Sequence, residues 1–131
     1  MKNLKIFILE DNLFYANLFM ARVEEMGYEN VQLFSASEEL LKEIHQQPSI
    51  VFLDHNLPDG KGLDVLKEIK STYPDVNCIM LSGQAIIGIV VDSYKYGAFD
   101  YLLKGVDDSP NELERVINDC INYTRAEHGN L

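Results

Sequence analysis

The stretch Ile50-Val51-Phe52-Leu53 consists of four consecutive apolar residues, and Asp54 follows it directly. A strand that is apolar on both faces is typical of a parallel sheet covered by helices on both sides. Residues 50–53 are therefore predicted to form a central, buried strand. Asp54 is predicted to stand at the carboxyl edge of the sheet.

Short apolar runs of the same kind recur on both sides of this stretch, and segments with helical features separate them. The other strands are expected over residues 4–9, 31–34, 78–81 and 99–103, and the helices over residues 13–26, 35–45, 62–73, 85–96 and from 110 onward. This strict alternation predicts an α/β fold, a doubly wound five-stranded parallel sheet with five helices. A single domain is expected over residues 1–124, followed by a polar C-terminal tail over residues 125–131.

Two of the predicted helices have clear boundary signals. Asn12 can cap the start of the helix over residues 13–26, and Gly27 can end that helix. In the last helix, Ser109 can be the N-cap and Pro110 fits the first helical position. The apolar residues expected on one face of the first helix are Leu13, Ala16, Phe19, Met20 and Val23.

Composition and charge exclude several classes of protein. A chain of 131 residues can bury its own core as one domain. Its net charge of −10 argues against direct nucleic-acid binding, because a phosphate backbone requires a basic surface. No apolar run is long enough for membrane insertion, and the first apolar segment is too short for a signal peptide, so a cytoplasmic location is expected. Cys78 and Cys120 are expected to be buried free thiols.

Ligands of such sheets bind beyond the carboxyl ends of the strands, so the residues after each strand are the candidates for a site. Glu10 and Asp11 follow the first strand, Asp54 the third, Ser82 the fourth and Lys104 the fifth. Each alone has an ordinary explanation, since an aspartate can cap a helix, a serine can form a turn, and a lysine can be a solvated surface charge. Their occurrence together at one edge indicates a common function.

The chemistry of this set favours phosphoryl transfer. Crowded carboxylates repel one another unless a cation joins them, and oxygen ligands suit Mg²⁺. A carboxylate can attack a phosphoryl group to give an acyl phosphate. A metal ion, a lysine and a hydroxyl group would neutralise the phosphoryl oxygens in the transition state. Asp54 is therefore the candidate nucleophile.

The sequence strongly resembles the receiver domains of bacterial two-component response regulators, of the chemotaxis-regulator type, from Lys5 to about Thr124. The motifs that carry the resemblance are Ile8-Leu9-Glu10-Asp11-Asn12, Leu53-Asp54-His55-Asn56-Leu57-Pro58-Asp59-Gly60-Lys61-Gly62, Met80-Leu81-Ser82-Gly83 and Gly97-Ala98-Phe99-Asp100-Tyr101-Leu102-Leu103-Lys104. The resemblance implies a flavodoxin-like fold. It also implies that Asp54 is the phosphoacceptor, that Asp11 binds Mg²⁺ directly, and that Glu10 does so through water.

The resemblance assigns roles to four further positions. Asn56 corresponds to the position whose backbone carbonyl completes the protein's share of the metal ligands. Ser82 corresponds to the switch hydroxyl that moves toward the phosphoryl group, and Lys104 to the lysine that pairs with that group. Tyr101 corresponds to an aromatic rotamer switch on the fifth strand, the alternative being an aromatic ring simply packed at a strand end.

Three local features need separate interpretation. The family usually has proline after the lysine, with a cis peptide bond, whereas this chain has Gly105; the loop is expected to be trans or more mobile, with Lys104 held less firmly. The run over residues 86–91 is wholly apolar, and it either packs inward or presents a surface for a partner. His55 is expected to be a surface histidine.

The function implied by the resemblance is that of a receiver in a phosphorelay. Its partners would be a histidine kinase or histidine phosphotransfer protein, and a downstream protein or a second copy bound at the face of the fourth helix, fifth strand and fifth helix. It would catalyse only its own phosphorylation and slow dephosphorylation. Whether the chain acts alone or belongs to a longer regulator stays open.

Three other classes of function fit the sequence less well. The first is a receiver-like interaction module that does not use phosphate, which the complete acidic set and Lys104 disfavour. The second is a flavodoxin-like cofactor binder, for which the acidic sequence after the first strand has the wrong charge. The third is an aspartyl-phosphate phosphohydrolase, in which a second acid usually occupies the position of Asn56.

Overall fold

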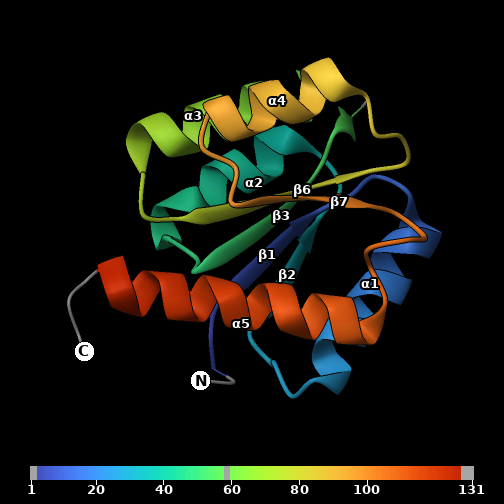
Figure 1. Ribbon diagram of the computed structural model, residues 1–131. Helices are drawn as coiled ribbons and strands as arrows, with labels where there is room; N and C mark the ends of the chain where they lie inside the picture. The colour runs from blue at the N-terminus through green and yellow to red at the C-terminus, as the bar shows by residue number, and fades with distance from the viewer. Residues whose placement is uncertain (1–2, 58–59, 128–131) are drawn as a thin grey trace.

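The computed structural model describes residues 3–57 and 60–127. Within these residues, five parallel strands form one sheet in the order β2-β1-β3-β6-β7, which confirms the predicted doubly wound fold (Figure 1). The central position of β3 agrees with its apolar sequence. The strands of this sheet are β1 (Ile6–Leu9), β2 (Val31–Phe34), β3 (Ile50–Asp54), β6 (Asn77–Ser82) and β7 (Asp100–Leu103).

Helices cover both faces of the sheet. Helices α1 and α5 lie on one face, and α2, α3 and α4 lie on the other (Figure 1). Their bounds are α1 (Leu13–Glu25), α2 (Ser37–Glu43) with a 3₁₀ turn (Ile44–Gln46), α3 (Gly62–Thr72), α4 (Ile87–Lys95) and α5 (Pro110–Glu127). A short antiparallel hairpin, β4 (Asn56–Leu57) and β5 (Gly60–Lys61), follows β3 and was not expected from the sequence.

The core divides into two layers because successive side chains of a strand point to opposite faces. In β1, Ile6 and Ile8 pack with residues of α1 and α5, whereas Phe7 and Leu9 pack with residues of α2 and α3. All four side chains are completely buried. The consecutive apolar residues of the sequence therefore supply both cores at once, as predicted for β3.

The helix boundaries largely follow their local signals. Asn12 Oδ1 accepts a hydrogen bond from the backbone N–H of Tyr15 at 3.0 Å, and Gly27 takes a left-handed φ of 98° after α1. Ser109 Oγ accepts the N–H of Glu112 at the start of α5. Two expectations need revision. The first is that Leu13 is 65% exposed rather than buried, and the second is that a short hairpin follows β3. Helix α5 extends to Glu127.

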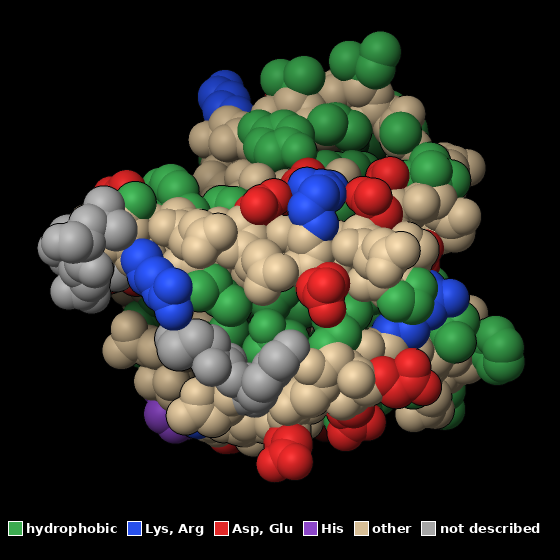
Figure 2. All heavy atoms as spheres, turned by 60° about the horizontal axis from the view of Figure 1, so that its bottom comes forward, with side chains coloured by type: hydrophobic (Ala, Val, Ile, Leu, Met, Phe, Trp, Pro, Cys, Tyr) green, Lys and Arg blue, Asp and Glu red, His purple; other side chains and the backbone are tan. Residues whose placement is uncertain are grey.

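Helix α4 presents apolar side chains to the surface rather than to the core. Ile87 is 81% exposed, and Ile86, Val91 and Tyr94 are each about half exposed. Figure 2 shows hydrophobic side chains gathered at the top of the molecule, over α4, above a band of charged side chains along α5. Of the two sequence-based interpretations of residues 86–91, the exposed surface is the one that the fold adopts.

The two cysteines and the lengths of the helices also bear on predictions from the sequence. Cys78 and Cys120 are buried free thiols, as predicted, and burial raises the pKa of each to about 12. Among the described residues, no helix combines the length and apolar character that crossing a membrane requires.

Candidate metal centre

The register of the sheet brings residues at the carboxyl ends of four strands into one row. The pairing of β1 with β3 puts Glu10 beside Asp54. The pairings of β3 with β6, and of β6 with β7, continue the row through Ser82 to Lys104. Glu10, Asp54 and Ser82 are buried, Lys104 is partly buried, and Asp11 is exposed at the rim. The site is thus a set of polar side chains at the end of an apolar sheet.

Lys104 connects two of the carboxylates. Its ammonium group lies 2.5 Å from Glu10 Oε1 and 3.3 Å from Asp54 Oδ1. The second oxygen of Glu10 accepts the backbone N–H of Asn12 at 3.0 Å. Asp54 Oδ1 also accepts the backbone N–H of Asn56 at 3.2 Å. These charge-assisted contacts compensate for the burial of both acids.

Glu10, Asp11 and Asp54 form a candidate cation site, because one carboxylate oxygen of each lies within 4.8 Å of the others. The pKa of Asp54 is raised from 3.8 to about 7, mainly by burial and next by the negative charge of Glu10. Lys104 and the Asn56 N–H oppose this shift. A cluster of oxygen ligands whose like charges repel fits Mg²⁺, since a divalent cation would offset that repulsion.

Ser82 and Tyr101 both make hydrogen bonds with the backbone of Gln84. Ser82 Oγ donates to the carbonyl oxygen of Gln84 at 2.7 Å and accepts the Gln84 N–H at 3.1 Å. The hydroxyl of Tyr101, which is half-buried, donates to the same carbonyl oxygen at 3.3 Å. One backbone group therefore links the hydroxyl beside Asp54 to the aromatic residue of β7.

The prediction of a surface histidine at position 55 is wrong, since His55 is only 7% exposed. Its backbone N–H donates to Leu81 at 2.8 Å, and its carbonyl oxygen accepts from Gly62 at 2.8 Å. A Cβ added at Gly62 would contact the carbonyl oxygen of Asp54 and lie 2.9 Å from His55 Cα. The close approach of α3, which only glycine permits, therefore encloses the chain at His55.

The peptide bonds of the described residues are trans, so the Lys104–Gly105 bond is trans, as expected without proline. Gly105 adopts a left-handed φ of 82°. Lys104 is nevertheless bound to Glu10 and Asp54 in the structure, and its ammonium group lies 4.6 Å from the centre of the Tyr15 ring. The expectation that Lys104 is held less firmly is not supported by these contacts.

Sequence reasoning missed two residues beside the site, Tyr15 and Asp108. The Tyr15 hydroxyl donates to Asp108 Oδ2 at 2.6 Å across 93 positions of the chain. Tyr15 lay on a helix whose apolar spacing was predicted from other residues, and Asp108 lay in a polar loop. Neither carried a local signal, because their contact arises only when α1 packs beside the loop after β7.

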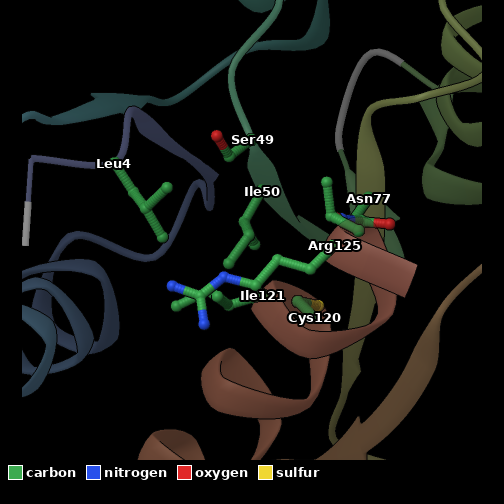
Figure 3. Close-up of a pocket in the computed structure, with 8 residues that line it drawn as sticks. Leu4, Ser49, Ile50, Asn77, Cys120, Ile121 and Arg125 are labelled. Carbon is green, nitrogen blue, oxygen red and sulfur yellow. The ribbon is translucent and has the colours of Figure 1, made fainter. Parts of the chain in front are cut away.

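A separate small cavity lies at the opposite, amino edge of the sheet. It has a volume of about 80 Å³ and is lined by residues that include Leu4, Ile50, Cys120 and Ile121. Figure 3 shows the side chain of Arg125 reaching across this end of α5. Small-molecule sites usually have about 300–1,000 Å³, so this cavity is too small for a drug-sized ligand. The acidic edge is the better candidate for function.

The fold and the acidic edge define a class of protein. The sequence model described as response regulator receiver domain matches residues 6–118, which is most of the chain. The chain therefore belongs to the response regulator receiver domain family. The resemblance stated from the motifs is thereby confirmed, together with the flavodoxin-like single-domain fold.

Individual relatives agree with this assignment. The chemotaxis protein CheY of Listeria monocytogenes is 31% identical over 115 residues, which are 87% of this chain and 92% of that protein. The transcriptional regulatory protein ZraR of Escherichia coli is 27% identical over 95% of this chain, but the chain spans only 28% of its length. A CheY-like receiver domain protein from Methanospirillum hungatei has a crystal structure with a TM-score of 0.87, at 26% identity, over 95% of this chain and 98% of that one.

Proposed function

We propose that this chain is the phosphoacceptor receiver of a two-component phosphorelay, in which Asp54 takes a phosphoryl group from a histidine kinase or a histidine phosphotransfer protein. The observation that carries the proposal is the position of Asp54. Asp54 is 4% exposed, its carboxylate forms an ion pair with the ammonium group of Lys104, and it belongs to a cluster with Glu10 and Asp11.

The reaction requires one bond to form and one to break. A carboxylate oxygen of Asp54 attacks the phosphorus atom, the P–N bond to the donor histidine breaks, and the electron pair leaves on the imidazole nitrogen. The product is an acyl phosphate on Asp54. Lys104 lies close enough to contact the oxygens of the transferred group. Mg²⁺ held by Glu10, Asp11, Asp54 and the backbone carbonyl of Asn56 would neutralise charge on the phosphoryl oxygens.

Phosphorylation would act on the surface through Ser82 and Tyr101, the two residues that donate to the Gln84 carbonyl. For Ser82 Oγ to contact a phosphoryl group on Asp54, it must give up its hydrogen bonds with Gln84. The segment between β6 and α4 could then shift, and the ring of Tyr101 could turn inward. Such a shift between two preexisting conformations is how a local change reaches a distant surface.

The surface that would respond is the face of α4, β7 and α5. Its exposed apolar residues on α4 suit contact with a downstream protein or a second copy of this chain, since a cluster of such side chains is a typical interaction site. The receiver would thus signal by contact. It would catalyse its own phosphorylation and slow dephosphorylation, and it would not turn over a metabolite.

The direct test is intact-mass measurement after incubation with Mg²⁺ and acetyl phosphate. We expect a gain of one phosphoryl group in the natural protein and none in Asp54→Asn. Asp75→Asn is the matched control, because Asp75 is an exposed carboxylate outside the site. It should gain the phosphoryl group as the natural protein does.

The same measurement distinguishes the alternatives. If no phosphoryl group is gained at any donor concentration, the chain is an interaction module that does not use phosphate. If inorganic phosphate is released rapidly and no phosphorylated protein accumulates, the chain is a phosphohydrolase. Either result would overturn the proposal.

A further inference from the structure

The loop that follows Lys104 is held by two of its own carboxylates. Asp107 Oδ2 accepts the backbone N–H of Leu103 at 2.8 Å, and Asp108 Oδ1 accepts the backbone N–H of Gly105 at 2.9 Å. The N–H of Lys104 itself donates to the carbonyl oxygen of Ser82 at 2.8 Å. Three successive backbone donors are therefore satisfied, and Lys104 is the middle one.

Gly105 cannot fix the conformation of this loop by itself, because glycine restricts its backbone less than any other residue. The fixed conformation must therefore come from the contacts that other residues make with the loop. Asp108 is the central contact, since its carboxylate reaches back to Gly105 and its side chain is almost completely buried.

Asp108 is in turn anchored to α1 by two residues. The hydroxyl of Tyr15 donates to Asp108 Oδ2 at 2.6 Å. The guanidinium group of Arg22 donates to the Asp108 carbonyl oxygen at 2.7 Å and lies 3.6 Å from Oδ2. These partners offset the free-energy cost of burying the Asp108 carboxylate, so Asp108 can fix the loop to α1.

Tyr15 also contacts Lys104 directly. The Lys104 ammonium group lies 4.6 Å from the centre of the Tyr15 ring, a distance at which a cation is attracted to the face of an aromatic ring. Tyr15 therefore supports the lysine with its ring and the lysine's loop with its hydroxyl group.

We propose that Tyr15 and Asp108 are positioning residues that hold Lys104 against the phosphoacceptor. The inference rests on the proposed phosphoryl transfer to Asp54, and it adds two residues to that site. Neither residue touches the reacting atoms. Their effect would be to keep the ammonium group where charge develops, which matters because preorganised charge requires no rearrangement during the reaction.

The variants separate the two contacts of Tyr15. Tyr15→Phe keeps the ring and removes the hydrogen bond to Asp108, Tyr15→Leu removes both, and Asp108→Asn weakens the anchor of the loop. Tyr123→Phe is the control for loss of a phenol, because Tyr123 lies on α5 with its ring against Phe99. Asp75→Asn is the control for loss of a carboxylate charge.

Two readouts are needed. The first is the rate of phosphoryl gain from acetyl phosphate at saturating Mg²⁺, with Mg²⁺ affinity measured separately by titration. The second is the ¹⁵N signal of the Lys104 ammonium group in metal-free protein, identified by its absence in Lys104→Arg. Thermal unfolding of each variant shows whether it is folded at the temperature of the assays.

We expect Tyr15→Leu to lower the phosphorylation rate by about 10- to 100-fold, since misplacement of a group by about 1 Å can cost that much. Tyr15→Phe and Asp108→Asn should give smaller losses. Mg²⁺ affinity should not fall, and the Lys104 signal should broaden or vanish in Tyr15→Leu. Both controls should match the natural protein.

Folded variants that keep the natural rate and an unchanged Lys104 signal would overturn the inference. So would a loss of rate that only follows the unfolded fraction. If Tyr15→Leu fails to fold, the same criteria apply to Tyr15→Phe and Asp108→Asn. If the natural protein accepts no phosphoryl group, the proposed function fails, and the Lys104 signal alone decides whether Tyr15 and Asp108 position the lysine.

Discussion

Lys104 Nζ lies 2.5 Å from Glu10 Oε1, so in the metal-free protein the lysine is paired most closely with an acid other than the proposed phosphoacceptor. Asp54 is farther from the lysine, at 3.3 Å. The ammonium group thus provides positive charge where a cation would also act. Lys104 and Mg²⁺ are therefore expected to compete for Glu10.

Replacement of Lys104 should separate metal binding from phosphoryl transfer. Lys104→Met removes a positive charge beside the cation site, so Mg²⁺ should bind at least as tightly as to the natural protein. The phosphorylation rate should fall by about 10²-fold, the usual effect of removing one group that stabilises developing charge. Titration with Mg²⁺ and timed intact-mass measurements give both quantities. Lys42→Met, which removes an exposed lysine on α2, is the control; weaker Mg²⁺ binding in Lys104→Met alone would contradict the prediction.

The raised pKa of Asp54 predicts a pH-dependent stability in metal-free protein. Its pKa is about 7 in the folded protein and near 3.8 when unfolded, so folding favours the protonated carboxyl. The contribution of Asp54 to the stability of the folded protein is complete below the pKa of the unfolded state and is lost as pH rises through the pKa of the folded state. Asp54→Asn has no such charge to bury. It should therefore gain stability over the natural protein as pH rises from 4 toward about 8, by up to a few kcal/mol.

Urea unfolding in the presence of a chelator at several pH values measures this difference. Asp75→Asn, at an exposed site, should show no comparable change with pH. A constant difference between Asp54→Asn and the natural protein from acid to alkaline pH would show that Asp54 titrates normally. Excess Mg²⁺ should stabilise the natural protein selectively at high pH.

Replacement by alanine should change the stability of the protein in opposite directions at two glycines, Gly62 and Gly88. Gly62→Ala would place a Cβ against the backbone of Asp54 and His55, and we expect a loss of about 1–3 kcal/mol because the contact is with main-chain atoms. Gly88 lies within α4 and a Cβ there would meet nothing within 4 Å. Gly88→Ala should stabilise the protein by about 1 kcal/mol through helix propensity. Denaturant unfolding measures both, and equal effects would refute the assigned close approach at Gly62.

The apolar surface of α4 predicts association. Ile87 is 81% exposed, and a charge at this position would oppose burial against any partner. If a second copy binds here, sedimentation should show a mass that rises with protein concentration, most strongly after phosphorylation, and Ile87→Glu should abolish the rise. Phe14→Glu is the matched control, because Phe14 is 82% exposed on α1. No change in Ile87→Glu would exclude self-association through this surface.

The sequence by itself determined the alternation of strands and helices, the central place of residues 50–53 and the set of polar residues at the carboxyl edge. These features are local or periodic, and the connection rules of parallel sheets turn them into one topology. The same reasoning predicted the caps at Asn12 and Ser109 and the buried thiols, because each depends on neighbouring residues or on apolar surroundings along the chain.

Only the tertiary structure decided where His55 and Leu13 lie and what supports Lys104. The burial of His55 depends on the approach of α3 at Gly62, and the exposure of Leu13 depends on how the first turn of α1 packs. The contact of Tyr15 with Asp108 joins segments 93 positions apart. Local patterns carry no information about such pairs, since the contact energy arises only after the helices have packed on the sheet.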